Sequence, residues 1–388
     1  MAGMGVFALL LAAATCAQVQ PAKGWPAAKL NEVGVDPTPL DALDAEIRAG
    51  KHGYVDSLLV VRCGKLVYRK TYAHDYDKIY GDRAKTAGPL NPDPAGPYNY
   101  FSADWHPFYK RGELHTMQSV TKTLTSVLIG VANGRKEFPS VDTPMMKFFD
   151  AAKVKHLDER KQRITIKHLL TMTAGIEWHE NLPYTDPRNS VNTMEASHDW
   201  VDYAVNLPMS EEPGTLFNYS SGSTQILSHI FKQATGRDIS DYAAEHLFRP
   251  MGIAHYWKRT PTGLSDTEGG LYLRDADLAK IGQLFLQGGV WQGKRLLPAG
   301  WVQDSVTEHV TVGNGPVKYG YKWWLQPYGA EGALAWAGSG FGGQRPLVMP
   351  KEQMVVVTTG WNILGPGLGV RRVLDAAYAA AKPHSCAQ

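Results

Sequence analysis

The stretch that decides the fold is Met117–Gly134, which reads MQSVTKTLTSVLIGVANG. Its apolar residues recur at helical spacing and form one continuous face: Val120, Leu124, Val127, Leu128 and Val131. Gly134 is typical of a position where a helix ends. Ser119 and Lys122 are three residues apart, so they lie on the same face of the first turn, where the lysine amine can reach the serine hydroxyl.

This Ser-x-x-Lys arrangement fits a nucleophilic serine with a lysine partner. The free N–H groups and the positive dipole end of a first helical turn favour an oxyanion at the serine. A lysine with its usual pKa of about 10.4 is charged, so a basic role for Lys122 requires burial or a partner. The alternative interpretation is that Ser119 is an ordinary helix cap beside a solvent-exposed lysine.

Two further segments carry groups that acyl-transfer chemistry uses. Phe217-Asn218-Tyr219-Ser220-Ser221 precedes a predicted helix, and a tyrosine held near Lys122 can shuttle a proton. Gly338-Ser339-Gly340-Phe341-Gly342-Gly343-Gln344 leads into a predicted strand, where glycines indicate close approach of the backbone to a ligand. The alternatives are a packed core tyrosine and a glycine-rich turn.

Strand patterns occupy both ends of the chain and helix patterns occupy the middle. The predicted strands are Ser57–Cys63 and Leu66–Tyr72, joined by a Gly64-Lys65 turn, then Val317–Gln326, Gln344–Val348 and Met354–Thr359. The predicted helices include Leu40–Ala49, Ile166–Met172, Ser223–Ala234, Ala276–Gln287 and Gly369–Ala381. The pattern predicts a discontinuous α/β domain over 18–139 and 263–388, with a mostly helical domain over 140–262 inserted into it.

The three segments, in this order, resemble the serine β-lactamase-like superfamily. It includes class C β-lactamases, DD-peptidases, family VIII carboxylesterases and 6-aminohexanoate-dimer hydrolase. The resemblance extends to Leu170–Gly175, Asp275–Ala279 and Gly288–Val290. It implies an antiparallel sheet flanked by helices, of the β-lactamase/transpeptidase type, with an inserted helical domain.

The resemblance also implies roles for individual residues. Ser119 would be the acylated nucleophile, Lys122 its activating partner and Tyr219 the general acid and base. The backbone N–H groups of Ser119 and Phe341 would form the oxyanion hole. Eight further residues are candidates for substrate binding: Ser221, Gly338, Ser339, Gly340, Tyr184, Trp323, Trp324 and Glu268.

The chain departs from the β-lactamase pattern in two places. Many β-lactamases and DD-peptidases carry Lys-Thr-Gly or His-x-Gly where this chain reads Gly338-Ser339-Gly340 (Trp336-Ala337-Gly338 is the competing register). Arg345 can replace the missing cation, or strand alternation can turn it outward. Ser221 stands where β-lactamases usually have Asn. Both departures favour the esterase and amide-hydrolase branch.

The leading hypothesis is therefore a serine hydrolase that cleaves carboxylic esters or small amides through an acyl-enzyme. A β-lactamase or D-Ala-D-Ala carboxypeptidase of the same fold is the alternative, and a non-catalytic binding protein on this scaffold is the alternative of another class. The other common serine-hydrolase architecture, the α/β-hydrolase fold, is excluded because the chain has no G-x-S-x-G motif to carry its nucleophile.

The segment Asp75–Arg111 holds eight of the 40 aromatic residues and five prolines, and it directly precedes the serine helix. Long segments of this kind are usually functional, so we expect it to form a wall or lid of the acyl pocket. An insertion packed by its own aromatic side chains is the alternative.

The composition and the two ends of the chain predict the kind of partner, the location of the protein and the state of its cysteines. A net charge of +3 without a long basic run gives no footprint for nucleic acid, and no metal or cofactor motif is present, so the expected partner is a small molecule. Val6–Thr15 is an apolar run too short to span a membrane, which predicts a signal peptide over 1–17 and a periplasmic or secreted protein. A lipoprotein anchored through Cys16 is less well supported. Cys63 and Cys386 are expected as free thiols rather than as a disulfide.

Overall fold

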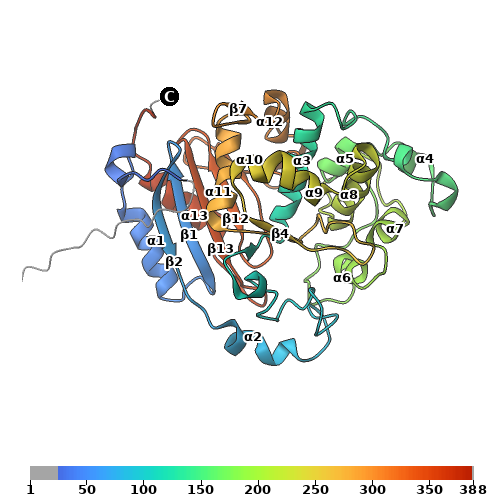
Figure 1. Ribbon diagram of the computed structural model, residues 1–388, viewed down its shortest axis with the longest axis horizontal. Coiled ribbons are helices and arrows are strands. Elements are labelled where there is room, and N and C mark those ends of the chain that lie inside the picture. The colour runs from blue at the N-terminus through green and yellow to red at the C-terminus, as the bar shows by residue number, and fades with distance from the viewer. Residues whose placement is uncertain (1–24, 387–388) are drawn as a thin grey trace, which may run out of the picture.

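The computed structural model describes residues 25–386, and its centre is an eight-stranded antiparallel sheet (Figure 1). The strands run across the sheet in the order β2 (Lys65–Thr71), β1 (Val55–Arg62), β13 (Met354–Gly360), β12 (Arg345–Met349), β11 (Ala333–Ala337), β10 (Trp324–Tyr328), β9 (Lys318–Tyr319) and β8 (Val310–Thr311). The N-terminal hairpin thus pairs with the C-terminal strands through β1 and β13. The predicted fold class, an antiparallel sheet flanked by helices, is confirmed.

The sheet has helices on both faces (Figure 1). On one face, α1 (Thr38–Arg48) and α13 (Val370–Ala380) close an apolar core with β1, β12 and β13. On the other face lies α11 (Asp275–Leu286), which contacts β12 and β13. Gly282 allows this close packing, because an added Cβ would lie 2.7 Å from Cγ1 of Val355.

The helix that carries Ser119 is α3 (Val120–Gly134), and it lies in the interior of the second core, packed against the helices of the middle region. The other helices are α2 (Tyr76–Ala84), α4 (Glu159–Gln162), α5 (Ile166–Leu170), α6 (Ser190–Glu195), α7 (Trp200–Val205), α8 (Ser221–Thr235), α9 (Ile239–Ala243), α10 (Arg249–Met251) and α12 (Ala299–Ser305). Short 3₁₀ turns cover Leu30–Val33, Tyr109–Arg111, Met145–Phe148 and Ala151–Lys153, and a π turn covers Ala244–Phe248.

Two small sheets complete the structure. β3 (His115–Thr116), β5 (Leu271–Leu273) and β4 (His255–Trp257) form one, and β6 (Val290–Trp291) pairs with β7 (Lys294–Arg295) in the other. The three-stranded sheet brings Thr116, just before the serine helix, beside Tyr272. The predicted domain boundaries at 139/140 and 262/263 remain predictions.

Two sequence predictions about strands need correction, and one five-residue strand was missed. The turn between β1 and β2 is Cys63-Gly64, with φ of 52° and 69°, one residue earlier than predicted. The single strand predicted over Val317–Gln326 is two strands, β9 and β10, because Lys322 between them has a φ of 63°. β11 was not predicted, because three of its five residues are alanine, which has a low β-propensity.

The segment 75–111 is an ordered insertion rather than a wall of the serine pocket. It begins with α2, and Tyr98, Tyr100 and Phe101 are buried in the same core as α3. Tyr76 stacks on Tyr80 with ring centroids 6.1 Å apart. None of its residues lines the cavity at Ser119, so the prediction of a lid was wrong, because a dense aromatic segment in sequence looks the same whether it faces a cavity or a core.

The two cysteines that were expected to be free are bonded. Cys63, in the turn after β1, forms a disulfide with Cys386, and their Cα atoms are 5.3 Å apart. The bond joins the N-terminal hairpin to the C-terminal segment that follows α13. Sequence reasoning missed it because the partners are separated by 323 residues. The predicted signal peptide lies outside the described residues. Within 25–386, no helix has the length and apolarity needed to cross a membrane.

Candidate active site

Ser119 and Lys122 are in direct contact at the start of α3. Ser119 is the residue that caps the helix, and Lys122 lies one turn further along, with its Nζ donating to Oγ of Ser119 over 2.8 Å. The glycine-rich segment 338–344, called the third motif below, follows β11 and passes close to this turn. An added Cβ at Gly340 would lie 2.5 Å from the carbonyl oxygen of Met117, so only glycine fits there. Because Gly340 has no side chain, the third motif can lie close to the start of α3 and so beside Ser119.

The loop after Gly340 presents a free backbone N–H to the same cavity as Ser119. Gly342 and Gly343 have φ of 94° and 127°, a conformation that favours glycine, and the loop closes when the N–H of Gly340 donates to the carbonyl oxygen of Gln344. Neither the N–H of Ser119 nor that of Phe341 has an acceptor among the residues that the structure describes. Two such donors beside a nucleophile can stabilise an oxyanion.

Lys122 is held by three hydrogen bonds in a fully buried position. Its side chain is 1% exposed, and besides Ser119 it donates to the carbonyl oxygen of Glu268 over 2.8 Å and to Oε2 of Glu268 over 3.2 Å. Burial alone would lower the pKa of Lys122, but Tyr219, once ionised, and the carboxylates of Glu268 and Glu180 oppose burial and raise the pKa above its usual value. Lys122 therefore rests as an ammonium ion, with all three protons engaged.

Tyr219 lies over this lysine and lines the cavity. The Nζ of Lys122 is 5.3 Å from the centroid of the Tyr219 ring, and that ring stacks on Trp324 with centroids 5.6 Å apart. Burial raises the pKa of Tyr219, although the neighbouring Lys122 opposes the shift. Tyr219 is therefore a phenol at neutral pH and can donate a proton.

Behind the lysine lies a pair of carboxylates joined by one hydroxyl. Oγ of Ser221 is 2.8 Å from Oε1 of Glu180 and 3.1 Å from Oε2 of Glu268. Glu180 also accepts from the backbone N–H of Ser221, from Trp178 and from Tyr184. The serine has one proton and two acceptors, so the two carboxylates share it, and Nζ of Lys122 lies 3.2 Å from Oε2 of Glu268. Sequence analysis missed Glu180, which stands in a loop without any motif around it.

The cavity in front of Ser119 has a volume of about 380 Å³. Of the predicted site residues, it is lined by Ser119, Tyr219, Tyr184, Trp324, Ser339, Gly340 and Phe341. Tyr184 packs on Phe341 with ring centroids 4.7 Å apart, so the two rings form one wall. Lys122 lies just behind the surface of the cavity and is hydrogen-bonded to Ser119.

Four other candidates do not line the cavity. Ser221 and Glu268 are buried behind Lys122, where they contact it or each other. Gly338 is in the ladder between β11 and β12, where its N–H donates to the carbonyl oxygen of Pro346. Trp323 is fully buried in the core against Phe285, because the side chains of neighbouring residues 323 and 324 point in different directions.

Arg345 lines the cavity, which decides between its two predicted orientations. It is the first residue of β12, and its Nη1 donates to Oγ of Ser339 over 2.6 Å. Burial lowers the pKa of Arg345 from its usual value. The guanidinium and the Ser339 hydroxyl thus stand together on the side of the cavity formed by the third motif.

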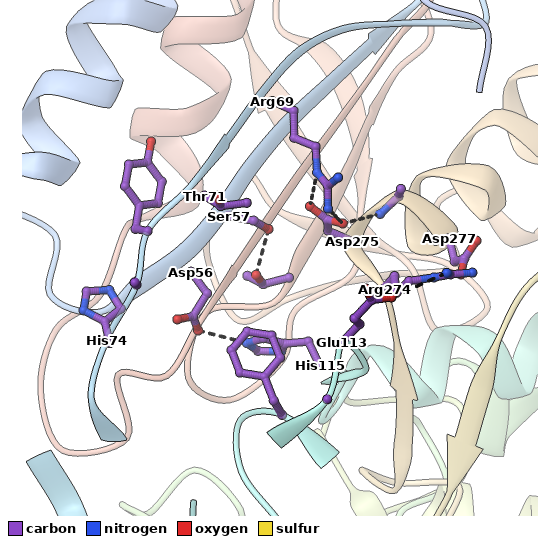
Figure 2. Close-up of a pocket in the computed structure, with 16 residues that line it drawn as sticks. Asp56, Ser57, Arg69, Thr71, His74, Glu113, His115, Arg274, Asp275 and Asp277 are labelled. Carbon is purple, nitrogen blue, oxygen red and sulfur yellow. Dashed lines mark hydrogen bonds and ion pairs between the residues drawn. The ribbon is translucent and has the colours of Figure 1, made fainter. Parts of the chain in front are cut away.

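A second, larger cavity of about 730 Å³ lies away from Ser119, between the hairpin and the start of α11 (Figure 2). Its arginines are paired: Arg69 with Asp275 over 2.8 Å, and Arg274 with Asp277 over 2.8 Å. His115 contacts Asp56 over 3.0 Å. Figure 2 shows the two side chains of each pair directed toward one another. Within 25–386, no cluster of three or more His, Cys, Asp or Glu side chains has the arrangement of a metal site.

The serine is hydrogen-bonded to a buried lysine, a tyrosine lies over that lysine, and two free backbone N–H groups are close by. This arrangement defines the class of serine hydrolases that work through an acyl-enzyme. The chain belongs to the Beta-lactamase family, whose model matches residues 40–366. The chain is 25% identical over 307 residues to 6-aminohexanoate-dimer hydrolase from Paenarthrobacter ureafaciens, covering 69% of this chain and 75% of that protein.

Solved structures share the fold. A D-stereospecific amidohydrolase from Streptomyces sp. superposes with a TM-score of 0.61 at 17% identity, covering 88% of this chain and 97% of the other. A family VIII carboxylesterase superposes with a TM-score of 0.60 at 16% identity, covering 88% and 96%. The protein is thus a serine hydrolase with a β-lactamase-type fold, as the sequence resemblance implied.

Proposed function

We propose that this protein hydrolyses carboxylic esters or small amides through an acyl-enzyme formed on Ser119. The observation that carries the proposal is the 2.8 Å contact between Lys122 Nζ and Ser119 Oγ, at the edge of a cavity that Tyr219 and the Phe341 loop also line. The N–H groups of Ser119 and Phe341 would stabilise the negative charge of the tetrahedral intermediate.

The proton of Ser119 needs an acceptor, and the ammonium form of Lys122 is not one. Glu268 contacts the same nitrogen, with Oε2 at 3.2 Å. Transfer of one proton from Lys122 to Glu268 leaves a neutral amine. Rotation about the Cε–Nζ bond turns its lone pair toward Ser119, and the amine takes the hydroxyl proton as the serine attacks. In this role Glu268 is a positioning and proton-storing residue that acts through Lys122.

The leaving group then needs a proton, and Tyr219 is placed to donate it. Its phenol is protonated at neutral pH because burial raises its pKa. After the alcohol or amine departs, the same tyrosine accepts a proton from the water that attacks the acyl-enzyme. When the acyl group leaves as the acid, Lys122 returns the proton to the Ser119 oxygen and Glu268 returns its proton to Lys122, so the cycle ends with the groups as they began.

The choice of esters and amides over β-lactams rests on the third motif and on Ser221, which stands where β-lactamases usually have Asn. Arg345 restores a cation to this side of the cavity, so the test includes a β-lactam. The chain has Gly338-Ser339-Gly340 where a β-lactamase-type site would have a lysine or histidine. Two solved structures of the same fold are named a carboxylesterase and an amidohydrolase, which supports the choice, whereas another is named a putative beta-lactamase. A β-lactamase or D-Ala-D-Ala carboxypeptidase remains the outcome that a substrate panel can reveal.

The test is intact-protein mass spectrometry of the wild type and of Ser119→Ala after exposure to a fluorophosphonate probe. We expect one adduct on the wild type and none on the variant. The same two proteins are then assayed with short-chain 4-nitrophenyl esters, 4-nitroanilides and nitrocefin. Loss of the nucleophile is expected to lower kcat by roughly 10⁴–10⁶-fold.

The panel separates the alternatives. An unlabelled wild type would support a non-catalytic binding protein and would contradict the proposal. Fast turnover of nitrocefin without turnover of esters or anilides would assign the protein to the β-lactamases. Ester or anilide turnover that requires Ser119 supports the proposal.

We also infer that the protein works in the periplasm or outside the cell. The support is the Cys63–Cys386 disulfide, since such bonds persist in oxidising compartments and are rare in the cytosol. Fractionation of the native host, with mass spectrometry of the mature N-terminus, tests this inference. A cytoplasmic protein that retains residues 1–17 would contradict it.

A further inference from the structure

The loop 266–270, between β4 and β5, carries Glu268 to Lys122. Both ends of the loop are hydrogen-bonded to the backbone of Lys258. The N–H of Asp266 donates to the carbonyl oxygen of Lys258 over 3.0 Å, and the N–H of Lys258 donates to the last residue of the loop over 2.9 Å. Between these ends, the carbonyl oxygen and the carboxylate of Glu268 both reach Nζ of Lys122. The position of Glu268 therefore depends on the shape of this loop.

The side chain of Asp266 holds the loop from the inside. It is fully buried, and its Oδ1 accepts from the N–H of Glu268 over 3.2 Å and from the N–H of Gly269 over 2.9 Å. Gly270 allows this arrangement, because an added Cβ there would lie 2.6 Å from Cβ of Asp266. The N–H of Gly269 belongs to the same peptide group as the Glu268 carbonyl oxygen that accepts from Lys122. One carboxylate oxygen of Asp266 thus fixes the peptide group that holds the lysine.

Two tyrosines of the segment 75–111 lie on the other side of this aspartate. The hydroxyl of Tyr98 is 3.3 Å from Oδ2 of Asp266, and burial raises the pKa of Tyr98, so the hydroxyl is a donor. The Nζ of Lys258 lies 4.2 Å from the centroid of the Tyr98 ring and 5.5 Å from that of Tyr100. The segment 75–111 therefore supplies a donor to Asp266 and covers a buried cation that attracts it.

The carboxyl group of Asp266 stands among several charges. Burial and the negative charge of Glu268 raise the pKa of Asp266 to about 6, although Lys258, the N–H of Gly269 and Lys122 act in the opposite direction. The titratable groups that face it are Lys122 from α3, Glu195 from α6, Lys258 after β4, Glu268 in the loop, Tyr272 from β5, and Tyr98 and Tyr100. Asp266 is therefore a carboxylate at slightly alkaline pH and takes up a proton as the pH falls through about 6.

We propose that Asp266 is a positioning residue for the reaction at Ser119, acting through Glu268 on Lys122, and that Tyr98 supports it. This proposal rests on the proposed function, in which Glu268 takes a proton from Lys122. As a carboxylate, Asp266 makes charge-assisted hydrogen bonds to the two N–H groups, and such bonds are about twice as strong as neutral ones. A neutral side chain holds the loop less firmly, and a displacement of about 1 Å in a reacting site can cost roughly 10²-fold in rate.

The variants Asp266→Ala and Asp266→Asn test the proposal. The rates to measure are kcat/KM for a 4-nitrophenyl ester and the rate of fluorophosphonate labelling. The alanine leaves the two N–H groups without their acceptor, so we expect both rates to fall roughly 10²-fold at slightly alkaline pH. The asparagine keeps an oxygen acceptor without the charge, as a protonated aspartate does, so a fall of roughly tenfold is expected.

The pH profile provides a readout that a merely structural role would not change. The wild-type rates should decline as the pH falls below about 6, because Asp266 then loses its charge. Asp266→Asn has no group to titrate at this position, so its profile should be flat there and meet the wild-type profile at low pH. Tyr98→Phe keeps the ring over Lys258 but removes a donor to Oδ2, which raises the pKa of Asp266. Its decline should therefore begin at a higher pH.

Asp199 offers a matched control. Its Oδ1 also accepts from two backbone N–H groups, those of Val201 and Asp202, over 3.0 Å each at the start of α7. Asp199→Ala and Asp199→Asn should keep both rates within about threefold of the wild type, with the same pH profile. Thermal unfolding of every variant, measured in parallel, shows which of them are folded.

The outcomes separate this proposal from the proposed function. An unlabelled wild type would refute the proposed function, whereas the variants are read against a wild type that is labelled. Rates in Asp266→Ala within about threefold of the wild type would overturn the positioning role. Equal losses in the two Asp266 variants, with the decline near pH 6 unchanged in Asp266→Asn, would show a structural role and also overturn it.

Two milder variants decide the question if Asp266→Ala does not fold. The proposal requires opposite changes of the pH profile, namely loss of the decline in Asp266→Asn and a shift to higher pH in Tyr98→Phe. Wild-type profiles in both variants would contradict it.

Discussion

The Ser119 cavity and the cavity between the hairpin and α11 differ in what their polar groups do. The larger one, shown in Figure 2, has about twice the volume of the other, and its arginines and buried carboxylates are paired with one another. In the smaller one, the Arg345 guanidinium has a single hydrogen-bond partner among residues 25–386, the Ser339 hydroxyl, and two backbone N–H groups have none. An unpaired buried polar group costs about 1–3 kcal/mol. The comparison teaches that open hydrogen-bonding capacity, rather than volume, marks the site of chemistry.

Among the variants that test this comparison, Glu268→Gln is expected to have the largest effect on activity. The glutamine has the shape of the glutamate and still offers an oxygen acceptor to Lys122. It cannot take up a proton from Lys122, and it lacks the negative charge that helps to raise the pKa of Lys122. We expect kcat/KM at neutral pH to fall by roughly 10²–10³-fold. The pKa of Lys122 should fall as well, so the residual activity should rise with pH where the wild-type profile is flat.

Initial rates across a pH series, with thermal unfolding in parallel, measure this effect. Glu177→Gln is the matched control, since that glutamate is exposed and pairs with His179 in the same region. A loss below about threefold would show that Lys122 does not use Glu268. A loss without alkaline recovery would indicate damage to the structure of the site.

The nucleophile and its partner could be predicted because the relationship is local. Ser119 and Lys122 are one helical turn apart, and helical periodicity fixes their shared face. Glu268 contacts Lys122 across 146 residues, and Glu180 contacts Ser221 across 41. Glu268 was predicted only as a substrate-binding candidate, and Glu180 was not predicted at all. No local pattern encodes contacts that depend on how distant segments come together.

The long elements of the fold were also predictable, and the short ones were not. The strand predicted over Met354–Thr359 is β13, which ends one residue later, because a continuous apolar run fits a strand that is buried on both faces. β8 and β9 are two residues long, too short for any periodicity to appear. The orientation of Arg345 also depended on tertiary structure, because strand alternation left both directions open.

The second prediction tests whether the larger cavity is structural. Arg69→Met removes the partner of Asp275, which is largely buried at the start of α11. An uncompensated carboxylate should lower the free energy of unfolding by about 2–3 kcal/mol. The serine site should be unaffected, with kcat/KM within about threefold of the wild type.

Denaturant titration and ester kinetics on the same preparation test both statements. Arg295→Met is the control, because that exposed arginine bonds only backbone carbonyl oxygens. Loss of activity with unchanged stability would give the larger cavity a functional role and would break the comparison. The double variant Arg69→Met/Asp275→Asn should recover part of the lost stability.

The smallest effect is expected at Lys322, a buried lysine next to the site. It is 1% exposed, and its Nζ has one hydrogen-bond partner among residues 25–386, Sδ of Met172 at 3.2 Å. Burial lowers its pKa well below the usual value, Lys122 adds to the shift, and Glu180 opposes it. Lys322 thus loses its proton at a lower pH in the folded protein than in the unfolded chain, and unfolding takes up protons in the pH range between the two pKa values.

The sign of the pH dependence follows from that proton uptake. Stability rises with pH wherever the unfolded chain binds more protons, so Lys322 makes the protein less stable below about pH 10 and has no such effect above it. Lys322→Met, which keeps the length and removes the amine, should raise the free energy of unfolding by about 1–3 kcal/mol at neutral pH. The gain should shrink toward zero as the pH approaches about 10.5.

Denaturant titrations of Lys322→Met at several pH values between about 6 and 10.5 test this prediction. The control is Lys318→Met, at a partly exposed lysine that pairs with Glu308, where no gain is expected at any pH. A variant that is less stable at every pH would mean that the amine stabilises the fold through Met172. The rule drawn from the two cavities would then need revision, because an almost unpaired polar group could stabilise the protein without binding a ligand.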